Sequence, residues 1–155
     1  MPPKARALNV FEKWHRAFHG TRKDSVKSIL KTGELLIPGD TLLGGRKLSE
    51  GPGHYTDDWK PKDFDTKQIF MSPSVRYSGM DVYAPACEFE DSCTKKIYEA
   101  KVVFQVYVNP SSYKVGPETI GEKSRIDPHF SNKEIEWFTK ERGSVIPYGL
   151  LIKLK

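Results

Sequence analysis

The most regular pattern in the chain is an alternation of apolar and polar residues between Ile97 and Val108. Successive side chains of a β-strand point to opposite faces, so a period of two predicts a strand with one buried face. The buried face is expected to carry Ala100, Val102, Phe104, Val106 and Val108, opposite Glu99, Lys101, Gln105 and Tyr107.

Shorter apolar runs predict the remaining strands. Gln68–Met71 is a compact apolar run typical of a buried strand, and Val145–Leu154 closes the chain with alternating apolar residues. Weaker patterns predict a first strand within Val10–Phe18, a short strand or turn at Leu35–Pro38 and a short edge strand at Tyr113–Val115.

One amphipathic helix is predicted over Asp24–Thr32. Its apolar residues, Val26, Ile29 and Leu30, recur at a spacing of three and four positions, which places them on one face. We expect Asp24 or Ser25 to cap its first turn and Gly33 to end it.

A second helix is predicted to begin at Ser72-Pro73-Ser74, because proline is favoured at the first helical position. Tyr77 follows Ser74 by three residues, so the two side chains share one face of the first turn. Taken alone, such a pair is more often packing than a binding site.

Three polar stretches are predicted to be loops: Gly39–Lys67, Ala84–Lys96 and Gly116–Ser131. The first is unusually long, and such loops are lids, binding loops or mobile insertions. Two groups in it suit a nucleotide, namely Gly44-Gly45-Arg46-Lys47 for a phosphate and His54, Tyr55 and Trp59 for a base, although a plain insertion explains the composition equally well.

The fold class indicated by these elements is α+β, with mostly antiparallel, split β-sheets and one or two short helices. The 155 residues fit one domain, which we place at residues 10–155 after a mobile lead-in at 1–9. We expect a monomer.

The composition of the chain indicates where the protein is located more clearly than what it binds. The 25 Lys and Arg against 20 Asp and Glu give a charge of +5, which suits an anionic ligand but also an ordinary solvated surface. No stretch is long and apolar enough for a bilayer, and the first residues lack the apolar core of a signal peptide. These features predict a soluble intracellular protein, cytoplasmic or nuclear.

Cys87 and Cys93 lack the close pairing of a zinc site, so we expect free thiols in a loop and no metal.

Two stretches carry candidate chemistry. In His19-Gly20-Thr21-Arg22, which joins the predicted first strand to the helix, the glycine lets a ligand approach the backbone. In Lys133–Thr139, a predicted strand, a period of two places Glu134 and Glu136 on one face. Glu136 lies between Ile135 and Trp137, where a carboxylate is expected only if it has a function.

Together these residues resemble the ADP-ribosyltransferase catalytic domain of the poly(ADP-ribose) polymerase, or diphtheria-toxin-like, type. The family's first motif is matched by His19-Gly20-Thr21-Arg22 with Ile29-Leu30 and Gly33, and its second by Phe70 with Ser74-Val75-Arg76-Tyr77. Its late glutamate, which follows an asparagine, is matched by Asn132 with Glu134 or Glu136. The resemblance covers His15 to the C-terminus. A looser likeness to a segment of Neuralized-like proteins is also present.

The resemblance implies a cleft for NAD lined by the His-Tyr-Glu triad. The backbone of Gly20 and the Ser74 hydroxyl would hold the nicotinamide amide, His19 and Thr21 would bond the adenosine ribose, and Arg22 completes this NAD-binding motif. Tyr77, with Phe70 or Tyr83, would stack on the nicotinamide. Phe70 stands where the family has tyrosine, so Tyr83 rather than Tyr77 remains open as the stacking residue.

The implied activity is NAD-dependent mono-ADP-ribosyl transfer to a protein or nucleic-acid acceptor. Glu136 would accept a hydrogen bond from the nicotinamide-ribose 2′-hydroxyl and stabilise the cationic sugar, and Glu134 would orient the nucleophile. The alternatives are an NAD glycohydrolase, which transfers ADP-ribose to water, and a catalytically silent module that binds NAD, ADP-ribose or nucleic acid.

Overall fold

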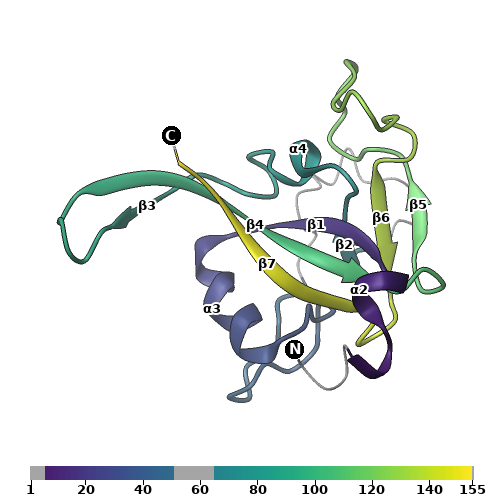
Figure 1. The fold of residues 1–155 in the computed structure, drawn as a ribbon, viewed down its shortest axis with the longest axis horizontal. Coiled ribbons are helices and arrows are strands. Elements are labelled where there is room, and N and C mark those ends of the chain that lie inside the picture. The colour runs from purple at the N-terminus through teal and green to yellow at the C-terminus, as the bar shows by residue number, and fades with distance from the viewer. Residues whose placement is uncertain (1–5, 51–64, 155) are drawn as a thin grey trace.

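The computed structural model describes residues 6–50 and 65–154, which form two antiparallel β-sheets and three short helices (Figure 1). The larger sheet contains β1 (His15–Thr21), β3 (Cys87–Glu90), β4 (Ile97–Val108) and β7 (Val145–Leu154). The smaller contains β2 (Ile69–Met71), β5 (Lys114–Gly116) and β6 (Glu136–Thr139). The helices are α2 (Val10–Lys13), α3 (Lys23–Thr32) and α4 (Val75–Ser78). The predicted α+β class with antiparallel sheets is confirmed.

Strand β4 is the centre of the larger sheet, as its alternating pattern predicts. One of its edges pairs with β7 from Ala100 to Val108. Its other edge pairs with β1 over Val102–Val108 and with β3 over Ile97–Ala100. In Figure 1 the β3–β4 hairpin extends away from the rest of the molecule as an arm. We call residues 87–100 the β3–β4 arm.

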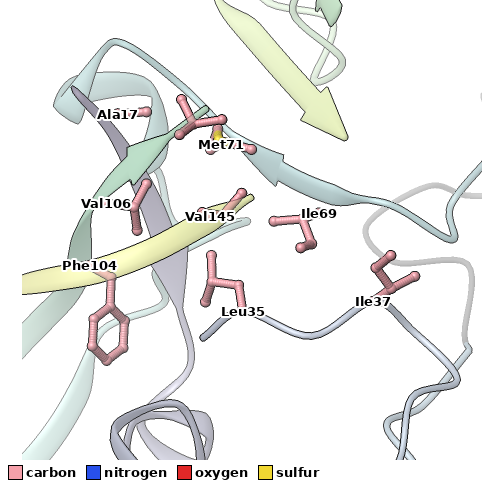
Figure 2. Packing of buried hydrophobic residues seen from close by; sticks show 9 residues of the cluster. Ala17, Leu35, Ile37, Ile69, Met71, Phe104, Val106 and Val145 are labelled. Carbon is pink, nitrogen blue, oxygen red and sulfur yellow. The ribbon is translucent and has the colours of Figure 1, made fainter. Parts of the chain in front are cut away.

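The hydrophobic core lies between the two sheets (Figure 2). The larger sheet contributes Ala17, Phe104, Val106, Val108 and Val145, and the smaller sheet contributes Ile69 and Met71. Leu35 and Ile37, from the segment after α3, complete the cluster. Burial of these apolar groups from both sheets in one cluster is what fixes the position of one sheet against the other.

The two sheets also meet through the backbone at one point. The Phe18 N–H donates to the Ser72 carbonyl oxygen at 2.7 Å, and the Ser72 N–H donates back to Phe18 at 2.9 Å. This bridge joins β1 to the residue that follows β2, so the chain leading into α4 begins beside β1.

Four predicted segments differ from the structure. Val10–Phe18 is not one strand, because α2 occupies its first four residues and β1 begins at His15. Residues 6–9, assigned to the lead-in, form helical and turn structure in which the Asn9 side chain donates to Glu12. Ala84–Lys96 is not all loop, because β3 pairs there with β4. The strand predicted over Lys133–Thr139 begins only at Glu136.

The helix ends differ in detail from those expected. Arg22, rather than Asp24 or Ser25, is the N-cap of α3, and it makes no side-chain capping bond. Gly33 ends α3 as predicted, with a φ of 72° that favours glycine. Pro73 precedes α4 instead of opening it, because Ser74 is the N-cap.

The remaining expectations concern loops and cysteines. Leu35–Pro38 is irregular and ends in a turn, with no strand. The predicted loop Gly39–Lys67 is described up to residue 50 and again from 65, so His54, Tyr55 and Trp59 lie outside the described residues. Cys87 and Cys93 are free thiols, although Cys87 lies on β3. No helix within 6–50 and 65–154 has the length and apolar character needed to cross a membrane.

Candidate active site

Two adjacent pockets share residues of β1 and β2, and α4 and β6 complete the inner pocket, whereas α3 and the segment after it complete the outer pocket. The inner pocket, of about 50 Å³, is lined by His19, Gly20, Phe70, Met71, Tyr77, Ser78, Tyr83 and Glu136. The outer pocket, of about 330 Å³, is also lined by His19, Phe70 and Tyr83. These three shared residues form the boundary between the two spaces.

Glu136 is the charged group of the inner pocket. As the first residue of β6 it is only 2 % exposed. Three hydroxyl oxygens lie close to its Oε2 atom: Thr119 at 2.8 Å, Tyr77 at 2.9 Å and Tyr83 at 3.2 Å. In the described part of the chain no hydrogen bond reaches Oε1 of this side chain. One carboxylate oxygen is therefore held in place by three hydroxyls, and the other has no hydrogen bond from the described residues.

The hydroxyl groups form an ordered chain. The Tyr77 hydroxyl donates to Glu136 and accepts from the Thr119 N–H at 3.0 Å and from Tyr83 at 2.7 Å. A tyrosine hydroxyl has one hydrogen to donate, and the shorter distance from Tyr83 is to Tyr77. Tyr77 and Thr119 are thus the direct donors to the carboxylate, and Tyr83 supports them.

Burial and charge determine the ionisation of this cluster. Burial raises the pKa of Glu136 above its usual range, although hydrogen bonds from Thr119 and the tyrosines offset part of the effect. Burial raises the pKa of Tyr77 and of Tyr83 as well, and the negative charge of Glu136 adds to both shifts. Both tyrosines therefore keep their protons, and any negative charge in the pocket resides on Glu136.

His19 lies between the pockets in a fixed orientation. Its Nδ1 is 2.7 Å from the Phe70 carbonyl oxygen, which can only accept, so Nδ1 carries the hydrogen. Burial lowers the pKa of His19 and favours the neutral ring. In that form Nε2 is a hydrogen-bond acceptor, available to a ligand hydroxyl.

Gly20 presents backbone groups to the inner pocket. In a strand, alternate residues direct their N–H and C=O to the same edge, and those of Phe18 already point to Ser72. The N–H and C=O of Gly20 therefore point away from β4, and no backbone partner for them occurs within residues 6–50 and 65–154. A Cβ atom here would lie 2.1 Å from the Ser78 carbonyl oxygen and 2.7 Å from the Tyr83 Cβ, so only glycine fits.

The outer pocket combines apolar and polar walls. Thr21 and Ser28 supply hydroxyls, and Gln68 supplies an amide. Arg46, from the predicted phosphate-binding group, also lines this space, held in a turn by the bond from the Leu42 N–H to its carbonyl at 2.8 Å. The pocket thus offers hydrogen bonds and the positive charge of Arg46, while Asp24 and Glu34 add two carboxylates to the same lining.

Several expected site residues lie elsewhere. Ser74 is buried away from both pockets, and its hydroxyl donates to Asp127 at 2.6 Å while accepting from the Tyr77 N–H at 3.1 Å. Arg22 is exposed at the start of α3 and lines neither pocket. Glu134 is exposed in the turn before β6, which leaves Glu136 as the glutamate of the inner pocket.

Three contributing residues were missed in the sequence. Ser78 lines the inner pocket, and its hydroxyl donates to the Phe18 carbonyl at 2.9 Å. Thr119 and Asp127 come from the loop between β5 and β6, which has no periodic pattern to mark them. Burial raises the pKa of Asp127, but the bonds from Ser74 and the His129 N–H outweigh it and keep the net pKa low.

A search with models of protein families and a search of solved structures found no match for this chain. The described residues also contain no group of three or more His, Cys, Asp or Glu side chains arranged to hold a metal ion. The function is therefore argued from the geometry of the two pockets.

Proposed function

We propose that the chain is an NAD-dependent mono-ADP-ribosyltransferase, with NAD lying across the inner and outer pockets. One observation carries the proposal: His19, Tyr77 and Glu136, which are far apart in the sequence, line one small pocket together with the backbone of Gly20. They are the three residues that the family resemblance selects.

The nicotinamide end of NAD fits the inner pocket in chemical character. Its carboxamide needs one acceptor and one donor, which the C=O and N–H of Gly20 supply. The oxygen of the Ser78 hydroxyl, which donates to Phe18, can accept a further bond in the role first expected of Ser74. Phe70 and Tyr77 line the same pocket and offer ring faces for stacking.

The adenosine end of NAD fits the outer pocket. Nε2 of His19 would accept a hydrogen bond from a ribose hydroxyl, since the other ring nitrogen is occupied by Phe70. Arg46 would pair with the pyrophosphate, whose negative charge matches its guanidinium.

Entry of the nicotinamide requires a movement of Tyr83. The inner pocket, at about 50 Å³, is too small for an aromatic ring with its carboxamide. Tyr83 lines both pockets and is tilted 57° to the Tyr77 ring at a centroid distance of 5.1 Å. Rotation of Tyr83 would join the two spaces and release its bond to Tyr77.

The reaction would proceed by loss of nicotinamide and capture of the sugar. The C1′–N bond breaks with its electron pair going to the nicotinamide nitrogen, which leaves an oxocarbenium-like ribose. Glu136, oriented by Thr119 and Tyr77, accepts a hydrogen bond from the 2′-hydroxyl and stabilises this positive charge. A nucleophile of the acceptor forms the new bond to C1′ and releases its proton to solvent.

A second candidate, the catalytically silent binding module, is favoured by one observation. The Tyr83 hydroxyl already lies 3.2 Å from Oε2 of Glu136, and the inner pocket holds only about 50 Å³. In that case ligands would enter only the outer pocket, and calorimetry would detect NAD or ADP-ribose binding without nicotinamide release.

The proposal is tested by incubating the chain with labelled NAD and a mixture of protein and nucleic-acid acceptors. Free nicotinamide, free ADP-ribose and labelled macromolecule are measured in parallel. We expect labelled macromolecule, and we expect Glu136→Gln to lower its formation roughly 100- to 1,000-fold, the usual loss when one transition-state charge contact is removed. The matched variant Glu134→Gln, at an exposed position two residues away, should retain activity.

The other outcomes separate the alternatives. Free ADP-ribose as the sole product would identify an NAD glycohydrolase. Binding without nicotinamide release would identify the silent module. Full turnover in Glu136→Gln would disprove the mechanism.

A further inference from the structure

An apolar groove lies on the far side of α3 from the two pockets described above. Its volume is about 530 Å³, and its walls are α3, the β3–β4 arm and the C-terminal half of β7. Figure 1 shows these elements together at the end of the molecule where the arm extends. The groove shares no lining residue with the inner or outer pocket.

The floor of this groove exposes large apolar side chains. Leu30 of α3 is 59 % exposed, and Ile152 of β7 is 56 % exposed. Phe89 and Leu150, from the arm and β7, are also exposed and line the same space. Large exposed apolar patches with a charged rim are uncommon on protein surfaces, and they usually mark a site where another molecule binds.

The charged residues that line the groove in the described part of the chain are all lysines. Lys23, Lys27 and Lys31 line it and recur every four residues, so they form one row along α3. The Lys23 ammonium donates to the Glu88 carbonyl at 2.9 Å and ties α3 to the arm. Lys27 and Lys31 are exposed and make no ion pair within the described part of the chain.

We propose that the groove binds an amphipathic helix of a partner protein, with an apolar face and carboxylates four residues apart along one flank. The apolar face would cover Leu30, Phe89 and Ile152, and the carboxylates would pair with Lys27 and Lys31. The ten residues of α3 span about 15 Å, which matches about three turns of a partner helix.

Shape and charge favour this occupant over a lipid. The floor lies between α3 and the strands β3, β4 and β7, and Ala100 on this floor is only 1 % exposed, out of reach of a flat bilayer. A fatty acid has one carboxylate, whereas the rim presents two unpaired ammonium groups in a row. A helix with acidic residues at i and i+4 matches both the apolar floor and the spacing of the charges.

The test selects binders from a displayed library of random 16-residue peptides on the intact chain. Counter-selection uses Leu30→Glu, an exposed position at which the substitution leaves the core unchanged. Selected peptides are then measured by fluorescence anisotropy against the chain, Leu30→Glu, Lys27→Glu and the control Leu43→Glu, whose leucine is 74 % exposed outside the groove. Circular dichroism follows the peptide's helicity on binding.

We expect enrichment of acidic amphipathic sequences that become helical when bound. Leu30→Glu should weaken their binding about tenfold or more, and Lys27→Glu about two- to fivefold, whereas Leu43→Glu should leave it unchanged. The absence of enrichment, or selection of basic or extended peptides, would overturn the proposal. So would binding of oleate or phosphatidylcholine–phosphatidylserine vesicles that Leu30→Glu abolishes. None of these outcomes bears on the NAD assay.

Discussion

At the scale of single residues, Glu136 is a buried carboxylate that hydrogen-bond donors stabilise. The hydroxyls of Thr119, Tyr77 and Tyr83 surround one oxygen, yet burial still raises the pKa of this carboxyl. A carboxyl whose folded pKa is raised contributes stability at low pH that is lost as the pH rises through the raised value.

This linkage predicts the stability of Glu136→Gln. The variant cannot ionise, so its free energy of unfolding relative to the natural chain should increase between pH 4 and pH 8. Urea denaturation at the two pH values measures the difference, with Glu134→Gln as the exposed control. An unchanged difference would mean that Glu136 titrates as an ordinary surface carboxyl.

Thr119 gives a second prediction at this scale. Thr119→Val keeps the shape of the side chain but removes the donor 2.8 Å from Glu136, so the pKa of Glu136 should rise further. The acid limb of the pH profile for nicotinamide release should therefore move to higher pH, and the maximal rate should fall about tenfold, as for a hydrogen bond to a charged group. A shift of the limb is specific to the carboxylate, because general destabilisation would not move it. Thr41→Val, at an exposed threonine, is the control.

At the scale of elements, Gly20 is the position at which β1 packs directly against α4. An added Cβ would meet the Ser78 carbonyl oxygen at 2.1 Å, and this backbone atom can move only if α4 moves. Gly20→Ala should therefore lower the free energy of unfolding by about 1–3 kcal/mol and abolish nicotinamide release.

The control for this prediction is Gly33→Ala. Its φ of 72° makes alanine cost about 1–2 kcal/mol, but the Cβ would meet nothing within 4 Å. We expect Gly33→Ala to be about as stable as Gly20→Ala in urea denaturation but to retain nicotinamide release. Equal loss of activity in both variants would show that stability, and not the position of α4, limits the reaction.

Elements with one buried face were predictable from the sequence, and elements that depend on a partner were not. β4 alternates because the core takes Phe104, Val106 and Val108, and α3 repeats because Val26 and Ile29 pack on that core. β7 alternates as well, although only its first residue, Val145, lies in the core and its last residues are exposed. β3 carries two glutamates and is fixed by pairing with β4, which no local pattern shows. α2 is a single turn entered through Asn9 in a left-handed conformation, so its four residues resembled a strand.

The candidate site divides in the same way. His19, Gly20 and Tyr77 lie on elements whose ends are marked by glycine or by a serine cap, and these were predicted. Thr119 and Asp127 come from a loop whose path depends on other contacts, such as the Asn132 side chain, which bonds the Ile126 N–H and the Ser124 carbonyl. Such contacts join loop residues that follow no repeating pattern of apolar and polar positions, so they could not be predicted from the sequence.

At the scale of the whole molecule, the pockets depend on how the two sheets are held against each other. His19 belongs to the larger sheet and Glu136 to the smaller, and both line the inner pocket. Their separation is set by the shared core and by the Phe18–Ser72 bridge, not by either sheet alone. Activity should therefore respond to core packing at a distance from the pockets.

Phe104 provides the test of this dependence. It is 1 % exposed and is the largest fully buried side chain among residues 6–50 and 65–154, so Phe104→Ala should cost about 3–5 kcal/mol in urea denaturation. Because the core unites both sheets, hydrogen exchange should increase in β6 as well as in β4. Phe89→Ala, on the exposed arm, should change stability by less than about 1 kcal/mol. If β6 kept its protection from hydrogen exchange while β4 lost it, the two sheets would unfold separately. The shared core would then not determine the geometry of the inner pocket.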